Sequence, residues 1–314
     1  MGYFLFRRTL GFVLTLFAVS VVVFAVMNVL PGDPALTILG LDATEDALAA
    51  LREQLGLNDP LLTRYVHWVW NALHGDFGIS HSFGIPVAGL IGERLPMTIS
   101  LAVSGMIFTV ILALVMGIGA AANHRKPGDW GMMFISQLGI AIPAFWLSML
   151  LVLLFAVKLR WLPPGGFAGW DDPVAAMRSL ILPTVALALV QSSVLARVTR
   201  SSALEVMRQD FVRTARATGF SRRRILWRHV LPNALVPIVT IVGMQFAALV
   251  TGTIVIENVF YLPGLGRLIF QSISNRDLPT VQALVMLFAA IVVTANFIVD
   301  LLYVVIDPRL KARA

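Results

Sequence analysis

The stretch MTISLAVSGMIFTVILALVMGIGAAAN, residues 97–123, contains no Asp, Glu, Lys or Arg. A helix needs roughly 20 predominantly apolar residues to cross the hydrocarbon core of a bilayer. The stretch shows no two-residue alternation of apolar and polar side chains, which favours a helix over a strand of a membrane barrel. It therefore predicts a transmembrane helix.

Five further uncharged runs are long enough to cross a bilayer in the same way. The fourth of the six in chain order is the shortest and contains Pro183. With 58% hydrophobic residues, 13% charged residues and a mean hydropathy of +0.84, the 314-residue chain is far more apolar than a soluble domain. We expect an all-α integral membrane protein with six transmembrane helices, the other five being Thr9–Leu30, Trp130–Val157, Ser179–Ala196, Val230–Ile256 and Leu278–Val299.

The first apolar run resembles a signal peptide because Arg7 and Arg8 precede it. It is too long for the apolar region of a signal peptide, however, and no A-x-A cleavage site precedes Pro31. We expect a retained helix. The chain then divides into residues 1–30 with the first span, an extracytoplasmic segment 31–96, a five-helix core 97–308 with a cytoplasmic loop 197–229, and a cytoplasmic tail 309–314.

Basic residues are distributed unevenly between the two sides of this topology. Sixteen Lys and Arg fall on the side that carries both termini, against eight in the longer loops of the other side. Cytoplasmic loops of membrane proteins carry the excess of Lys and Arg. The split predicts a multi-pass membrane protein with both termini in the cytoplasm. The net charge of +7 is thereby assigned to membrane lipid and not to nucleic acid.

Motifs for a reaction centre are missing from the sequence. The chain has no cysteine and no Walker, H-E-x-x-H or G-x-S-x-G pattern. His67, His74 and His81 recur every seven residues, but Gly75 and Gly78 interrupt any single helix through them. We expect separate surface histidines, no metal site, no catalytic residue and no cofactor bound by this chain.

Polar residues within or beside the spans are the candidates for a translocation path or gate. They either line a water-filled path or hydrogen-bond neighbouring helices. Gln191 and Gln245 are the best path candidates because they are large and lie near mid-span. Glu257 and Gly264 belong to a predicted outer gate at 257–267, where Pro263, Gly264 and Gly266 permit a non-helical turn; simple interfacial solvation of Glu257 is the alternative. Asp300 is expected to form a structural pair.

Nine of the arginines lie between Arg197 and Arg228. Within this loop Asp210 can cap a helix from Phe211 to Thr218 that Gly219 ends, and Ser221 can cap a second helix. Positive-inside topology accounts for Arg222–Arg224 and Arg228. It does not explain a glycine-broken helix pair with apolar side chains. That arrangement suits insertion into a groove of a partner protein, with Phe211, Val212, Ala215 and Phe220 as the inserted side chains.

The loop resembles the cytoplasmic motif of ABC importer membrane subunits, E-A-A, three residues, G, nine residues, I-x-L-P. Ala215, Gly219, Leu231 and Pro232 match it, whereas Arg213, Thr214 and His229 depart from it. RTARATG at 213–219 is similar to the variant found in dipeptide, oligopeptide and nickel permeases. So are LPGDPA at 30–35, LGLNDPLLTRY at 55–65, GDFGIS at 75–80, ERLPMT at 93–98, IPAFW at 142–146, ENVFYLPGLGRL at 257–268, NRDLPTVQ at 275–282 and DLLYVVIDPRL at 300–310.

The resemblance implies a type I ABC importer permease fold and the first of two unlike permease subunits. It further implies two cytoplasmic ATP-binding subunits, which carry ATP and Mg, and an extracytoplasmic solute-binding protein that docks on the acidic segment 31–96. The cytoplasmic coupling helix would be seated in one ATPase, through residues Asp210, Phe211, Val212, Arg213, Thr214, Ala215, Arg216 and Gly219.

Short peptides are the expected cargo of such a machine. Nickel chelates, glutathione, peptide antibiotics or other small solutes are the alternative, because this branch of importers carries them all. An intramembrane hydrolase using Asp300 is disfavoured because a second acid at matching depth is missing. An autonomous channel or secondary transporter is disfavoured because the two halves show no inverted repeat.

Overall fold

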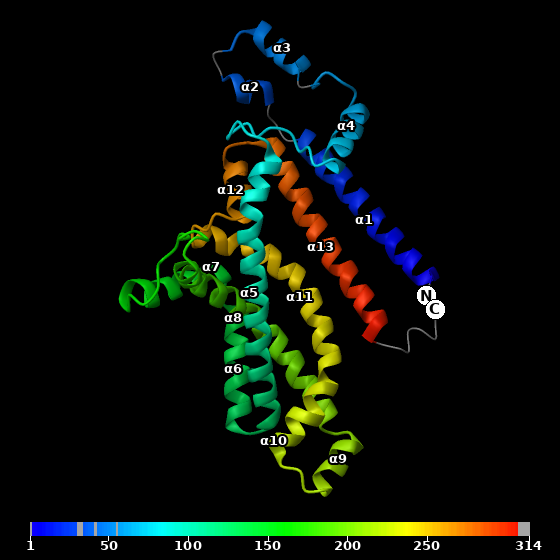
Figure 1. Cartoon of the computed structure of the whole chain (residues 1–314), viewed down its shortest axis with the longest axis vertical. Helices are drawn as coiled ribbons and strands as arrows, with labels where there is room; N and C mark the ends of the chain where they lie inside the picture. Colours follow the sequence, from blue (N-terminus) through cyan, green and yellow to red (C-terminus); the bar gives the residue numbers. More distant parts are fainter. Residues whose placement is uncertain (1, 30–33, 41–42, 55, 307–314) are drawn as a thin grey trace. The chain divides into compact units, whose positions relative to one another are not determined.

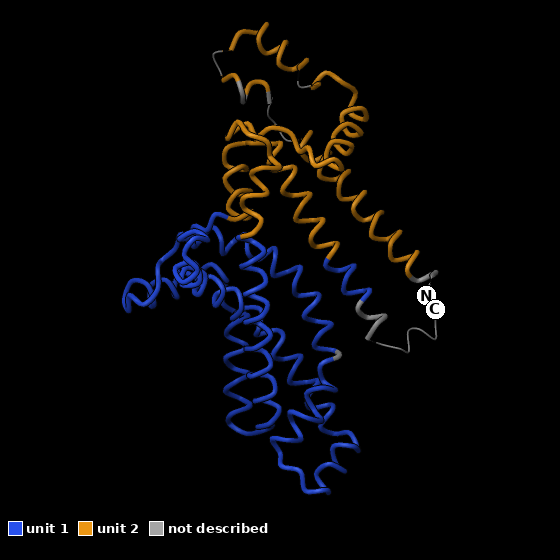
Figure 2. Tube along the Cα trace, in the orientation of Figure 1, with its two compact units in different colours: residues 1, 97–263, 295–314 blue, residues 2–96, 264–294 orange. Residues whose placement is uncertain are grey.

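The computed structural model describes residues 2–29, 34–40, 43–54 and 56–306. The regular elements in these ranges are helices, joined by turns and by irregular segments such as 159–172. An isolated β-bridge joins Ile79 and Pro86. The chain divides into two compact units, drawn in different colours in Figure 2. Unit 1 contains residues 97–263 and 295–306 of the described chain, and unit 2 contains residues 2–96 and 264–294. The expected tail 309–314 lies outside the described residues.

Within the described residues, five helices are long and apolar enough to cross a membrane, and the number is six if one bent helix pair is counted as a single span. The five are α1 (Gly2–Val29), α5 (Val87–Ala122), α8 (Pro173–Val206), α11 (Leu231–Val259) and α13 (Leu278–Ile306), labelled in Figure 1. Five of the six expected spans are therefore confirmed as single helices, including the fourth, which contains Pro183.

The third expected span is wrong as a single straight helix. Its apolar run is divided between α6 (Pro127–Ala141) and α7 (Ala144–Leu151), which continues as the π-helical segment η1 (Val152–Lys158). The two halves meet at 107°. Pro143 has no backbone N–H and disfavours helical geometry at the residue before it, so Ile142 is extended with ψ 124°. Hydropathy cannot detect this bend because every residue around it is apolar.

Helix α8 is the central element of unit 1 and packs against α6, α7 and α11. Asp172 caps its first turn, since Oδ1 accepts hydrogen bonds of 3.0 Å from the backbone N–H groups of Val174 and Ala175. Small residues let its neighbours approach closely, as is common between membrane helices. A Cβ on Gly117 of α5 would lie 2.7 Å from the carbonyl oxygen of Ala196. Of the five long helices, α8 has the lowest mean hydropathy and the largest buried share, because it lies in the centre of unit 1.

Three short elements connect α8 to α11 at one end of unit 1. They are α9 (Asp210–Ala217), α10 (Arg222–Ile225) and the π-helical segment η2 (Leu226–Val230). In Figure 1 α9 and α10 lie beyond the turn that joins α5 to α6. The loop is shorter than the expected 197–229 because α8 continues to Val206.

Unit 2 contains α1, the small helices α2 (Pro34–Leu39), α3 (Glu45–Gln54) and α4 (Leu61–Leu73), and α12 (Leu265–Ser274), together with the first parts of α5 and α13. Ser20 of α1 and Tyr65 of α4 share a hydrogen bond of 2.7 Å between their hydroxyl oxygens. The fully buried Asp277 carboxylate accepts hydrogen bonds from the Ser80 hydroxyl, from the Thr280 hydroxyl at 2.8 Å and from the backbone N–H of His81 at 3.1 Å. Asp277 thus connects the loop before α5 to the start of α13.

Candidate functional site

Helix α9 is amphipathic, and its apolar face packs on other parts of the same chain. Val212 is fully buried and Ala215 is 6% exposed, in one core with Ile225 of α10 and Ala121 of α5. The interpretation of Val212 and Ala215 as side chains for a partner's groove is therefore wrong: their burial holds α9 in place. Phe211 is 39% exposed and remains a candidate for insertion into a partner.

The two ends of α9 are fixed by different chemistry. Its N-cap is Gln209, without a side-chain cap bond, so the expected cap at Asp210 is wrong. Asp210 starts the helix and its Oδ1 lies 3.3 Å from Nη1 of Arg213. Gly219 ends the helix as predicted, with φ +86°. The backbone N–H of Gly219 donates to the carbonyl of Arg216 at 3.0 Å, and that of Phe220 donates to the carbonyl of Ala215 at 3.3 Å. This is a Schellman motif.

Phe220 is turned toward the chain's own second helix. Its ring stacks on the imidazole of His229, with centroids 5.6 Å apart, and the guanidinium of Arg224 lies 4.7 Å from the ring centroid. Phe220 therefore has contacts within the loop, yet it is still 37% exposed, so its insertion into a partner stays a prediction. Ser221 caps α10 as predicted, accepting a hydrogen bond of 3.4 Å from the N–H of Arg224.

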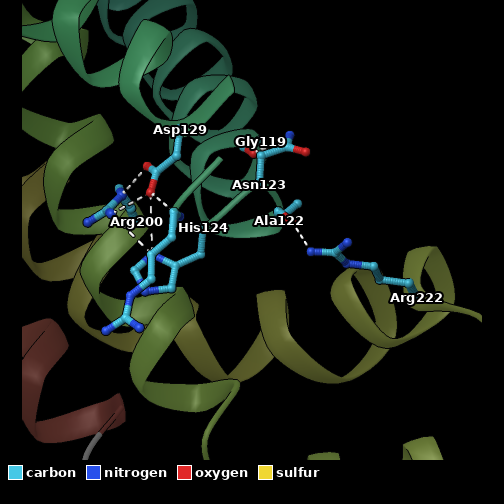
Figure 3. Close-up of polar contacts among 8 residues, drawn as sticks. Gly119, Ala122, Asn123, His124, Asp129, Arg200 and Arg222 are labelled. Atoms are coloured by element: carbon cyan, nitrogen blue, oxygen red, sulfur yellow. Dashed lines mark hydrogen bonds and ion pairs between the residues drawn. The ribbon is translucent and has the colours of Figure 1, made fainter. Parts of the chain in front are cut away.

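A buried ion pair that the sequence does not predict joins α6 to α8 (Figure 3). Asp129 in the first turn of α6 is 4% exposed. Its two carboxylate oxygens accept hydrogen bonds from Nε and Nη2 of Arg200 on α8, at 2.6 and 2.7 Å. Asp129 directly precedes the uncharged run Trp130–Val157, and nothing in that run indicates that Arg200 is its partner.

Arg222 of α10 reaches the same α5–α6 turn. Its guanidinium donates a hydrogen bond to the carbonyl of Ala122, the last residue of α5 (Figure 3). The expected role of Arg222 was membrane topology alone, and the sequence does not predict this contact.

The expected path residues are distributed over several elements. Gln245 of α11 is 8% exposed, and its Nε2 donates a 3.3 Å hydrogen bond to the backbone carbonyl of Gln191 on α8. That pair joins two packed helices, as the helix-packing alternative expects. Glu257 is fully buried near the end of α11, so interfacial solvation of this carboxylate is wrong. Its Oε1 accepts a 2.7 Å hydrogen bond from the Thr98 hydroxyl of α5.

The predicted gate 257–267 is helical at both ends. Helix α11 ends at Val259, and α12 begins at Leu265 and includes Gly266 and Arg267. The non-helical turn is confined to 260–264. Within it Tyr261, and not Gly264, has a positive φ, of 54°, while Gly264 is extended with φ −109°. A role for Gln191, Gln245, Glu257 or Gly264 in translocation stays a prediction.

The sequence matches the model of binding-protein-dependent transport system inner membrane components over residues 113–312. The N-terminal model of the same kind of component matches residues 1–102. The chain belongs to this family. Its resemblance to the dipeptide and oligopeptide permeases of ABC importers, stated from the loop motif, is thereby confirmed.

Curated permeases are similar along nearly the whole chain. A putative peptide transport system permease protein of Brucella abortus is 44% identical over 294 residues, 93% of this chain and 94% of that protein. A probable peptide ABC transporter permease protein of Sinorhizobium fredii is 40% identical over 99% of this chain and 100% of its own length. A glutathione transport system permease protein of Escherichia coli is 41% identical over 98% of both chains.

A solved structure supports the fold of this permease. The crystal structure of an amino acid ABC transporter with histidines aligns with a TM-score of 0.50 at 16% identity, over 68% of this chain and 92% of the solved chain. The all-α permease fold expected from the sequence agrees with this match.

Unit 2 of the permease contains a cavity of about 570 Å³. It is bordered by α1, α4, the loop before α5 and the start of α13. Its charged lining includes Arg52, Arg64, Asp59 and Asp76, next to aromatic Trp68. His67 and His81 also line it, whereas His74 bonds the backbone carbonyl of Trp70 through Nδ1. His81 is half-buried, so the three histidines are not all surface residues as expected.

Proposed function

We propose that this chain is the first of two unlike permease subunits in an ATP-driven importer of short peptides. Peptide cargo is supported by the names of the Brucella and Sinorhizobium relatives, which cover almost the full chain at 40–44% identity. The proposed complex lies in the bacterial cytoplasmic membrane with both chain termini in the cytoplasm. The excess of Lys and Arg on that side supports this orientation.

The observation that carries the proposal is the construction of α9. A short helix whose apolar face is buried in its own subunit, and whose exposed face carries Phe211 and the charged residues Asp210, Arg213 and Arg216, is suited to seat in a partner. We infer that the partner is one of two ATP-binding subunits. ATP and Mg bind to those subunits, and this chain is a transport subunit without a cofactor of its own. Closure of the ATPase pair then moves α9 and reorients the spans.

The predicted extracytoplasmic segment is the proposed contact surface for the solute-binding protein. It contains eight acidic residues against three basic ones between Pro31 and Pro96. It folds into helices α2, α3 and α4 and borders the cavity of unit 2. A connector between two spans does not require this much structure, which supports a docking role.

Glutathione is the second candidate cargo because a glutathione permease protein is 41% identical along 98% of the chain. Reconstituted proteoliposomes with the second permease, the ATPases and the cognate binding protein distinguish the two cargoes. We expect ATP-dependent uptake of a labelled dipeptide that unlabelled dipeptides suppress more strongly than glutathione or a nickel chelate. Stronger competition by either of the latter overturns the peptide assignment.

A further inference from the structure

Two arginines that flank α9 in the sequence contact the same turn, the one between α5 and α6. Arg200 lies on α8, the helix that leads into α9, and Arg222 lies on α10, the helix that follows it. Arg200 binds Asp129 in the first turn of α6, and Arg222 binds the carbonyl of Ala122 at the end of α5 (Figure 3). The turn is therefore held by one residue that precedes α9 in the chain and by one that follows it.

The ion pair between Asp129 and Arg200 resists separation. Both carboxylate oxygens are engaged by one guanidinium at 2.6 and 2.7 Å, the short distances of charge-assisted hydrogen bonds. Oδ2 also accepts a 3.0 Å hydrogen bond from the backbone N–H of Arg125. Because Asp129 is only 4% exposed, water cannot replace the guanidinium without rearrangement of the turn. Breaking one partner of a buried pair leaves the other charge uncompensated.

His124 completes the cluster within the turn. Its Nδ1 lies 3.3 Å from Oδ2 of Asp129 and 3.3 Å from Nη2 of Arg200. A neutral imidazole nitrogen can donate to the carboxylate or accept from the guanidinium, but it cannot do both. Either tautomer therefore ties the turn to the ion pair.

Arg222 donates its hydrogen bond to a backbone carbonyl at the C-terminal end of α5. The last carbonyl groups of a helix have no intrahelical N–H partner, and a cation there also interacts favourably with the helix dipole. Ala122 is the last residue of α5, so the guanidinium of Arg222 occupies a position that requires a donor. The neighbouring Asn123 supplies a second donor, from Nδ2 to the carbonyl of Gly119 at 3.0 Å.

Apolar packing connects the same elements beneath the polar contacts. Ile118 and Ala121 at the end of α5 share one buried core with Val212 and Ala215 of α9 and with Ile225 of α10. The turn, α8, α9 and α10 are consequently joined by an ion pair, a helix-end hydrogen bond and a continuous core.

We propose that Asp129, Arg200 and Arg222 form an α5–α6 clamp that makes the α5–α6 turn move together with α9 when the ATPases close. This inference rests on the proposed function. The three residues are positioning residues, because they act through the helices and not on cargo or nucleotide. Without the clamp, α6 would stay joined to α8 by packing and by the 2.6 Å hydrogen bond from the Ser136 hydroxyl to the Ser193 carbonyl, but the α5–α6 turn would lose its polar contacts to α8 and α10.

The distance between two spin labels tests the joint movement directly. Because the chain has no cysteine of its own, each label can be attached to one introduced cysteine. Lys126→Cys in the turn and Ala217→Cys on α9 are both exposed. In the assembled complex we expect the same distance distribution between the labels with and without trapped ATP. In the Asp129→Asn and Arg222→Gln backgrounds we expect the distribution to broaden and to differ between the two nucleotide states.

Transport provides the functional readout. We expect Asp129→Asn and Arg222→Gln to lower uptake per ATP hydrolysed by roughly five- to a hundredfold, the usual range of coupling between sites, while ATPase co-purification stays unchanged. Arg200→Lys keeps the charge but loses the bidentate contact with Asp129. Its uptake per ATP hydrolysed should therefore lie between that of the wild type and that of the other two variants. Arg197→Gln on α8 and Arg223→Gln on α10, both exposed, are matched controls that should leave uptake unchanged.

The outcomes separate the clamp from the function on which it rests. A label distance that changes with ATP in the wild type, or normal coupling in Asp129→Asn, overturns the clamp. Loss of coupling in Arg223→Gln equal to that in Arg222→Gln also overturns it, because charge alone would then be responsible. If the wild-type complex binds ATPases and keeps the label distance but takes up no dipeptide, the cargo proposal fails and the clamp is retained. If no ATPase binds, the proposed function fails and the clamp with it.

Discussion

The hydroxyl of Thr98 on α5 donates a 2.7 Å hydrogen bond to the carboxylate of Glu257, which is fully buried near the end of α11. The contact joins residues 159 positions apart in the chain. A buried carboxylate depends on such donors because transfer of an ionised group out of water is costly. Thr98 is itself fully buried, so the pair joins α5 and α11 inside unit 1.

Thr98→Val should lower the free energy of unfolding by about 1–3 kcal/mol, the cost of depriving a buried acceptor of its donor. Thr109→Val is a matched control on the same helix. Thr109 is fully buried too, but its hydroxyl has no hydrogen-bond partner, so the isosteric change should be neutral or stabilising. The thermal midpoints of the two detergent-solubilised variants measure the difference. Equal midpoints would show that the Thr98 contact contributes nothing.

Gly219→Val should disturb the reversal of the chain after α9. The φ of +86° is strained for a β-branched residue, although a Cβ at this position would meet no atom within 4 Å. The effect therefore comes from backbone conformation alone. Gly219→Asn should retain most activity because Asn tolerates this region. Substrate-stimulated ATP hydrolysis in the reconstituted complex distinguishes the two variants, and equal impairment by both would contradict the conformational explanation.

The regular elements could be predicted because their causes are local. Charge-free runs predicted the spans, and Gly219 and Ser221 predicted the helix ends that are found. The direction in which α9 packs could not be predicted, because Val212 and Ala215 are equally suited to a partner's groove and to their own subunit's core. The pair of Asp129 with Arg200 also depends on how α6 and α8 pack, and periodicity along one helix contains no information about this.

His81 should make the stability of unit 2 dependent on pH. Burial lowers the pKa of its imidazole below the usual 6.5, and the neighbouring Asp277 carboxylate opposes this shift. The unfolded chain therefore takes up a proton at a higher pH than the folded chain, so stability falls as pH drops through 6.5 toward the lowered folded pKa. Below that pKa the loss is complete. His81→Gln should remove this part of the pH dependence.

Thermal midpoints of the wild type and of His81→Gln between pH 5 and pH 8 provide the measurement. The difference between the two proteins isolates His81 from the other titrating groups. His74→Gln is the control, since His74 lies at an exposed helix end. A wild-type curve that runs parallel to the His81→Gln curve would exclude the effect.

Single cysteines at Gln209 and Ala49 should label from opposite sides of the membrane. Both positions are exposed, Gln209 at the N-cap of α9 and Ala49 on α3. The sixteen-to-eight split of basic residues places the first in the cytoplasm and the second outside. A membrane-impermeant maleimide applied to intact cells should therefore modify Ala49→Cys alone. Modification of Gln209→Cys under the same conditions would contradict the orientation.

Phe211→Ala should weaken attachment of the ATPase and leave the permease folded. Phe211 is 39% exposed on α9, whereas its neighbour Val212 is fully buried. Removing the Phe211 ring should therefore lower the stability of the subunit little. If its ring inserts into the partner, truncation should cost on the order of 1–3 kcal/mol of binding free energy. Phe134→Ala on α6, where the ring is 64% exposed, is the matched control. Co-purification of the ATPase and its dissociation constant with each variant are measured. Loss of binding in Phe134→Ala, or unchanged binding in Phe211→Ala, would place the docking surface elsewhere than on the exposed side of α9.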